Sequence, residues 1–131
     1  MLQMWIAIEK LLVRRRFAFD AYGLILLLQF RTANWSDAYL VLDLSVNDFG
    51  GFRKYITEIP AFIAKHSGRY IVQGVQPMTI EGDWKPERLV IIEFPERGKA
   101  EAFLSDPEIQ DLFKVRHDTT TSRLVLADGC T

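Results

Sequence analysis

Two carboxylates, Asp43 and Glu93, lie inside otherwise apolar segments of the sequence. Charged side chains are rarely left in the interior of a sheet without a partner. A carboxyl group on an apolar surface loses hydration, and this favours proton exchange near neutral pH. One interpretation is therefore that Asp43 or Glu93 is an acid or base acting on a small enolisable molecule. The alternative is that each is a structural partner, paired with an arginine such as Arg88 or Arg123 or hydrogen-bonded across a dimer.

A second group of residues could line a pocket near such a carboxylate: Tyr55, Tyr70, Trp84, Arg88 and His117. Trp84 falls in a turn, where a large ring serves either as a dimer anchor or as a pocket wall. The tyrosines are also compatible with ordinary packing, with the hydroxyl hydrogen-bonded. His117 belongs to a polar run and is expected in solvent, unless a loop carries it over the mouth of a barrel.

Several function classes are disfavoured by composition. The formal charge of the 131 residues is −1, so nothing points to a nucleic-acid surface. His66, His117 and the lone Cys130 do not form a usual zinc set, and no glycine-rich phosphate loop is present. We therefore expect no cofactor and no metal. A single cysteine suits a reducing compartment, so a cytoplasmic location is predicted.

The elements that must position these residues follow from hydrophobic periodicity between residues 38 and 129. Strands are predicted at 38–45, 69–74, 88–94 and 119–127. A helix capped by Asn47 or Asp48 should bury Phe52, Tyr55, Ile56, Ile59, Phe62 and Ile63, bend at Pro60 and end at Ser67-Gly68, with Gly68 left-handed. A short helix at 97–104 precedes a second piece that begins at the capping box of residues 105–108.

The order strand, helix, strand, strand, helix, strand predicts an α+β, ferredoxin-like βαββαβ domain over residues 38–129. Strands one and three of this fold are adjacent and antiparallel. Asp43 and Glu93 should therefore lie toward opposite ends of the sheet, too far apart to share a proton within one subunit.

Residues 1–37 form an N-terminal extension with helical spacing, three consecutive arginines and an apolar run at 21–30. That run is too short to span a bilayer as a helix. Three interpretations remain: a helix or helical hairpin packed on the domain, an upstream extension without settled structure, or a membrane-surface anchor.

Both alternation classes of the first and third strands are apolar, so both faces of the sheet need a cover. The helices cover one face. A partner sheet would cover the other, which predicts a homodimer in the form of a dimeric α/β barrel. The N-terminal extension is the competing cover.

Several segments resemble the domain of unknown function 1330 family over residues 38–129: Ala-Tyr-Leu-Val-Leu-Asp43, Arg69-Tyr-Ile-Val, the Glu81-Gly-Asp-Trp turn, Ile-Glu93-Phe-Pro and Ser122-Arg-Leu-Val-Leu. The resemblance implies a dimeric α/β-barrel fold related to muconolactone isomerases and small cofactor-free monooxygenases. It implies no established activity. The chain departs from the family at Gln73-Gly74-Val75, where members often have Arg-Gly-Gly, so a basic side chain is missing there.

Together these features predict a small-molecule-binding α/β-barrel protein. In the sharper interpretation it is a cofactor-free acid/base enzyme on a small organic substrate, with Glu93 or Asp43 as the acid or base. The alternative is a non-catalytic dimerisation or ligand-sensing module. The expected partners are a second copy of the chain and a small organic ligand, with no nucleic acid. Membrane contact through residues 1–37 is a further alternative.

Overall fold

The computed structural model describes residues 37–130. Along the chain, the elements are β1 (Ala38–Val46), α3 (Phe49–Lys65), β2 (Arg69–Val75), β3 (Arg88–Phe94), α4 (Arg97–Ser105), α5 (Gln110–Thr119) and β4 (Thr120–Asp128). The strands form one antiparallel sheet in the order β2-β3-β1-β4. This is the ferredoxin-like arrangement, so the predicted fold class is confirmed and β3 is central as its apolar sequence indicates. The three interpretations of the N-terminal extension fall outside the described residues.

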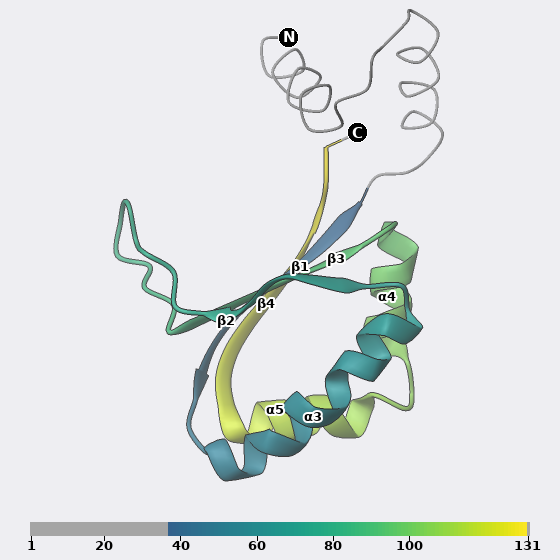
Figure 1. Ribbon diagram of the computed structural model, residues 1–131, viewed down its shortest axis with the longest axis horizontal. Coiled ribbons are helices and arrows are strands. Elements are labelled where there is room, and N and C mark those ends of the chain that lie inside the picture. Colours follow the sequence, from purple (N-terminus) through teal and green to yellow (C-terminus); the bar gives the residue numbers. More distant parts are fainter. Residues whose placement is uncertain (1–36, 131) are drawn as a thin grey trace, which may run out of the picture. The chain divides into compact units, whose positions relative to one another are not determined.

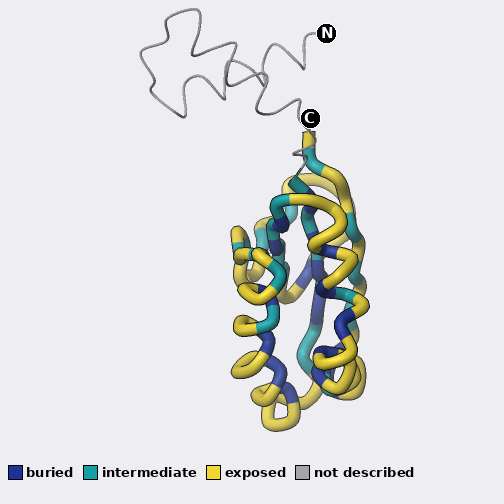
Figure 2. The backbone as a smooth tube through the Cα atoms, turned by 90° about the vertical axis from the view of Figure 1, so that its right-hand side faces the viewer, coloured by how far each residue is buried: buried dark blue, intermediate teal, exposed yellow. Residues whose placement is uncertain are grey.

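The three helices lie against one face of the sheet (Figure 1). Burial along β1 follows the pleat: Ala38, Leu40, Leu42 and Leu44 are buried, whereas the residues between them are only half-buried. The buried residues, dark blue in Figure 2, gather between the sheet and the helices. One face of β1 therefore packs into the core beneath the helices, and the other face points away from it.

Helix α3 packs over the sheet and covers the cavity that lies between them. Asp48 is its N-cap, and the carboxylate accepts a hydrogen bond from the Gly51 amide at 3.1 Å. Its buried stripe is Phe52, Tyr55, Ile59 and Ile63, at the spacing of one helical face. Two expected members differ: Phe62 is only half-buried and Ile56 is exposed. Pro60 lies within α3.

The end of α3 differs from the expectation in one detail. Ser67, not Gly68, takes the left-handed conformation, with φ of 65°. Gly68 is needed for a different reason, since a Cβ there would lie 2.7 Å from a ring carbon of Phe94. The glycine therefore permits close packing of the chain on the core rather than a left-handed turn.

The predicted capping box at 105–108 also forms differently. Ser105 Oγ donates to the Glu101 carbonyl, while the carboxylate of Asp106 accepts from the Glu108 amide at 2.9 Å. Helix α5 begins only at Gln110, after this turn. It buries Leu112 and Phe113, and Ile109 just before it is also buried.

Candidate functional site

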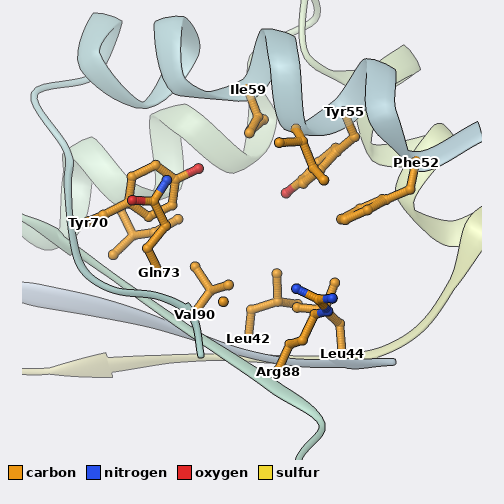
Figure 3. Close-up of a pocket in the computed structure, with 12 residues that line it drawn as sticks. Leu42, Leu44, Phe52, Tyr55, Ile59, Tyr70, Gln73, Arg88 and Val90 are labelled. Atoms are coloured by element: carbon orange, nitrogen blue, oxygen red, sulfur yellow. The ribbon is translucent and has the colours of Figure 1, made fainter. Parts of the chain in front are cut away.

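A cavity of about 280 Å³ lies between α3 and the sheet. Most of its wall is apolar, with Phe52 and Ile59 from α3 and Leu42, Leu44 and Val90 from the sheet. Four polar side chains from α3, β2 and β3 point toward the same space: Tyr55, Tyr70, Gln73 and Arg88 (Figure 3). An apolar pocket with a few convergent polar groups is the usual form of a small-molecule site.

The hydroxyl of Tyr55 connects the cavity to a buried arginine on α5. Arg116 donates from an Nη atom to this hydroxyl oxygen at 3.3 Å. The guanidinium also lies 5.1 Å from the ring centre of Phe113 and 5.7 Å from that of Tyr55. Arg116 is only 6% exposed, and its Nε has no hydrogen-bond partner among residues 37–130. A positive charge is therefore held directly behind one wall of the cavity.

Strand β2 brings Tyr70 and Gln73 to the same face through irregular pairing. Their partners in β3 are Ile92 and Val90, both on the helical side, although residues three apart in a regular strand face opposite sides. The register shifts twice, between Tyr70 and Val72 and again between Gln73 and Val75. Gly74 has φ of 67° within the second shift. Such bulges re-aim side chains, and here the result is that both polar groups face the cavity.

Tyr70 is a hydrogen-bond donor at neutral pH. Burial, and to a smaller extent the neighbouring Tyr55, raises the pKa of Tyr70 to about 12. The phenol therefore stays protonated throughout the physiological range.

Arg88 is the charged side chain among the described residues that line the cavity. It pairs with Leu44 across the β1–β3 ladder and so shares the helical face. Its guanidinium lies 5.2 Å from the ring centre of Phe49 in the first turn of α3. Within residues 37–130 no carboxylate forms an ion pair with it.

Asp43 and Glu93, the candidate acid and base, lie on the opposite face of the sheet from the cavity. In the β1–β3 ladder Asp43 pairs with Leu89 and Glu93 with Tyr39, four positions apart, as expected from the topology. Glu93 Oε1 forms an ion pair with Arg69 at 2.8 Å. The Arg88 and Arg123 side chains suggested as partners make no ion pair among the described residues.

Trp84 lies on the same outer face as Asp43. Its indole N–H donates to the Asp43 carboxylate at 2.8 Å. Both residues border an open groove of about 710 Å³ that Val41, Arg123 and Val125 also line. The structure thus separates the predicted site residues: Tyr55, Tyr70 and Arg88 meet at the cavity, whereas Asp43 and Trp84 meet at this groove.

His117 belongs to neither set. It is exposed in the last turn of α5, with Nε2 3.2 Å from an Nη atom of Arg116. Arg116 itself, and Gln73, were not singled out from the sequence. The spacing of Ile109, Leu112 and Arg116 on one helical face was the signal that could have placed the arginine inside.

A different polar cluster joins α3 to the turn before α5. The buried Asp106 accepts from Lys65 Nζ at 2.9 Å, lies 2.7 Å from His66 Nε2 and accepts from the Glu108 amide. These hydrogen bonds, that of Lys65 above all, hold the pKa of Asp106 well below its usual range. The carboxylate of Asp106 thus has its hydrogen-bond partners within the fold. The cluster borders neither the cavity nor the groove.

Among residues 37–130, no set of three or more His, Cys, Asp or Glu side chains is gathered in a way that could hold a metal ion. None of the helices there has both the length and the apolar character that crossing a bilayer requires.

The four-stranded antiparallel sheet, with its helices on one face and a cavity beneath them, defines a ferredoxin-like α+β domain. The chain belongs to the family described as Domain of unknown function (DUF1330), which it matches over residues 37–130. A comparison with curated proteins gave no match.

Solved structures share the fold. A protein of unknown function from Rhodopseudomonas palustris is 16% identical with a TM-score of 0.61, over 82% of this chain and 93% of that one. A mutant of SnoaB, a cofactor-independent oxygenase from Streptomyces nogalater, is 16% identical with a TM-score of 0.53, over 72% of this chain and 94% of that one. At these identities the likeness shows the fold alone.

Proposed function

We propose that the protein binds a small organic molecule in the cavity between α3 and the sheet. The observation that carries this proposal is the convergence of Tyr55, Tyr70, Gln73 and Arg88 on one apolar space of about 280 Å³. A packed core normally leaves few voids larger than a water molecule. The cavity is at the small end of the range for ligand pockets, so the ligand is small.

The proposal is tested by NMR titration of the protein with fragment-sized molecules. We expect the backbone amides of Tyr55, Gln73 and Val90 to shift, since these residues line the cavity. A Val90→Phe variant fills the space and should abolish the shifts. Val125→Phe adds the same bulk to an exposed site on the other face and should leave them intact. If no fragment perturbs the cavity residues in the parent protein, the proposal is wrong.

The outer face of the sheet supports a second proposal, that two copies of the chain associate through it. Val125 is 59% exposed, Val75 53% and Trp84 55%, although all three are large apolar residues. Val125 and Trp84 border the groove of about 710 Å³, and the loop carrying Trp84 extends away from the helices (Figure 1). A partner sheet would remove these side chains from water and complete an α/β barrel.

Oligomeric state tests the second proposal directly. Sedimentation of the full chain should give a dimer, and Val125→Glu should shift it toward monomer. Ile56→Glu is the matched control, because Ile56 is 54% exposed but lies on α3. A parent protein that sediments as a monomer at all accessible concentrations excludes the homodimer.

The acid/base role of Asp43 and Glu93 stays a prediction, as does the cytoplasmic location. The ion pair of Glu93 with Arg69 favours a structural role for that carboxylate. Asp43 borders the outer groove, so any chemistry it supports belongs to that groove and not to the cavity. SnoaB shows that this fold is compatible with an enzyme that uses no cofactor, but its oxygenase activity is not part of the proposal.

A further inference from the structure

We propose that the ligand of the cavity is a small organic carboxylate with an apolar body. This inference rests on the proposed binding function and adds the chemical class of the ligand. Arg88, Tyr55 and Tyr70 would donate hydrogen bonds to the carboxylate, while the aliphatic and aromatic walls would contact the rest of the molecule.

The lining of the cavity is chemically suited to an anion. Neither aspartate nor glutamate occurs among the described residues around the cavity, and Arg88 brings a positive charge. Two phenol hydroxyls and a guanidinium offer hydrogen to a ligand, and Gln73 supplies both a donor and an acceptor. A cationic ligand would be repelled there. A neutral apolar ligand would leave the phenol donors without acceptors, which is costly at the buried Tyr55 and the half-buried Tyr70, whereas Arg88 and Gln73 are exposed and can keep water.

Arg88 is placed to meet a ligand anion. Its guanidinium points into the cavity from the strand that forms the floor, opposite Tyr55 and Phe52 of α3 (Figure 3). Two other arginines of the domain have carboxylate partners, Arg69 with Glu93 and Arg97 with Glu101 and Asp128. Among the described residues Arg53, Arg116 and Arg123 form no such ion pair. Arg88 has none in the described part of the chain, and its fork of N–H groups matches the two oxygens of a carboxylate.

The buried guanidinium of Arg116 lies behind Tyr55 and also favours an anion. Because the phenol oxygen of Tyr55 accepts from Arg116, its own proton is available to be donated into the cavity. The positive charge itself is 6% exposed and has no carboxylate partner within residues 37–130. A buried charge without a counter-charge is unfavourable, and the low dielectric around it extends its field. An anion in the cavity would lie across Tyr55 from this charge.

A carboxylate fits the site better than a phosphate. A phosphate dianion is usually held by several backbone amides or by a cluster of basic side chains. The described lining has one guanidinium and two hydroxyls, and its remaining surface is largely apolar. This arrangement suits a single charge attached to a hydrocarbon group.

Matched probes test the inference by calorimetry and NMR. Benzoate, phenylacetate and cyclohexanecarboxylate are each compared with the corresponding amide, and phenylphosphonate is added as the phosphate-like probe. We expect the carboxylates to bind about tenfold or more tightly than their amides, as hydrogen bonds to a charged group imply. The same amides should also shift as in the fragment titration.

Variants locate the effect. Arg88→Gln should weaken carboxylate binding about tenfold and change amide binding by less than about twofold. Arg53→Gln makes the same charge change on an exposed position of α3 and should leave both affinities unchanged. Tyr55→Phe should weaken the carboxylates selectively. Cooperative thermal unfolding of each variant establishes that it is folded.

The outcomes separate the two proposals. Equal binding of carboxylates and amides overturns the inference while the proposed binding function stands. Tighter binding of phenylphosphonate also overturns it. If none of the probes perturbs the cavity residues, both the inference and the binding function fail for ligands of this size. If Arg53→Gln weakens binding as much as Arg88→Gln, the anion is not held in the cavity.

Discussion

Asp106 and Arg116 are buried to nearly the same depth, at 7% and 6% exposure, but their surroundings differ. The carboxylate of Asp106 is met by Lys65, His66 and the Glu108 amide. The guanidinium of Arg116 has a phenol oxygen, two aromatic rings and an unpartnered Nε among the described residues. One charge joins secondary-structure elements and has its partners within the fold. The other lies behind a cavity.

This difference separates charges that hold the structure together from charges that are available to a ligand. A buried ion is tolerated when all its hydrogen bonds are made, and it is costly when they are not. We therefore expect the fold to depend on Asp106 and to be nearly indifferent to the charge of Arg116. Ligand binding should show the reverse dependence.

The largest effect on stability is expected for Asp106→Ala. The substitution removes the acceptor that ties the end of α3 to the turn before α5, and it leaves Lys65 with Glu108 alone. Urea denaturation should show a clear loss in the free energy of unfolding. Asp111→Ala is the control, because Asp111 is an exposed acid in the first turn of α5. Equal losses in the two variants would show that the Asp106 cluster has no special role.

The pH dependence of stability should report the same group. The pKa of Asp106 is lower in the folded state than the ordinary value of 3.8, chiefly because of the Lys65 hydrogen bond. The unfolded chain therefore binds this proton first as the pH falls, so the contribution is complete above about pH 5 and is lost progressively below it. Asp106→Asn should flatten the stability profile between about pH 5 and pH 3. The profile of Asp111→Asn should stay like that of the parent; an unchanged profile in Asp106→Asn contradicts the assignment.

Arg116 provides the opposite test. Arg116→Met keeps an unbranched chain against Phe113 and Tyr55 but removes the charge, so the free energy of unfolding should stay within about 1 kcal/mol of the parent. Arg116→Ala also loses the packing and should cost about 2 kcal/mol or more. Affinity for phenylacetate should fall in both. If Arg116→Met lowers the free energy of unfolding as much as Arg116→Ala does, the charge of Arg116 itself stabilises the fold. The contrast drawn with Asp106 would then be wrong.

Most of the fold could be predicted from the sequence, because β1 and β3 are nearly continuous apolar runs bounded by turn residues and α3 has a clear helical pattern. The separation of Asp43 from Glu93 follows from topology and strand spacing alone. Which face of β1 meets the helices does not, because both alternation classes of that strand are apolar. The details that differ are local packing events. Gly68 is required by the nearby Phe94 ring, and the turn at 105–108 is organised by Asp106 rather than Ser105.

The candidate site was harder to predict. Two carboxylates within apolar strand sequences drew attention to the outer face, whereas the cavity lies on the inner face, where hydroxyl, amide and guanidinium groups join its apolar wall. Gln73 was missed because strict alternation puts it on the opposite face from Tyr70. Only the bulges of β2 bring the two together, and the sequence marks them by a single glycine.

Substitution of Gly74 is expected to have the smallest effect on stability, and the effect should be confined to the bulge of β2. Gly74 has φ of 67°, and a Cβ added to it would meet nothing within 4 Å, so Gly74→Ala changes the backbone preference alone. The free energy of unfolding should fall by about 1 kcal/mol.

Gly82, with φ of 86° and equally open space, lies in the loop outside the ladder and is the matched control. Gly82→Ala should therefore lose similar stability in urea denaturation. The two variants should differ in probe binding, because relaxing the bulge at Gly74 turns Gln73 away from the cavity. Loss of phenylacetate affinity in both variants, or in neither, would show that the bulge does not position the site.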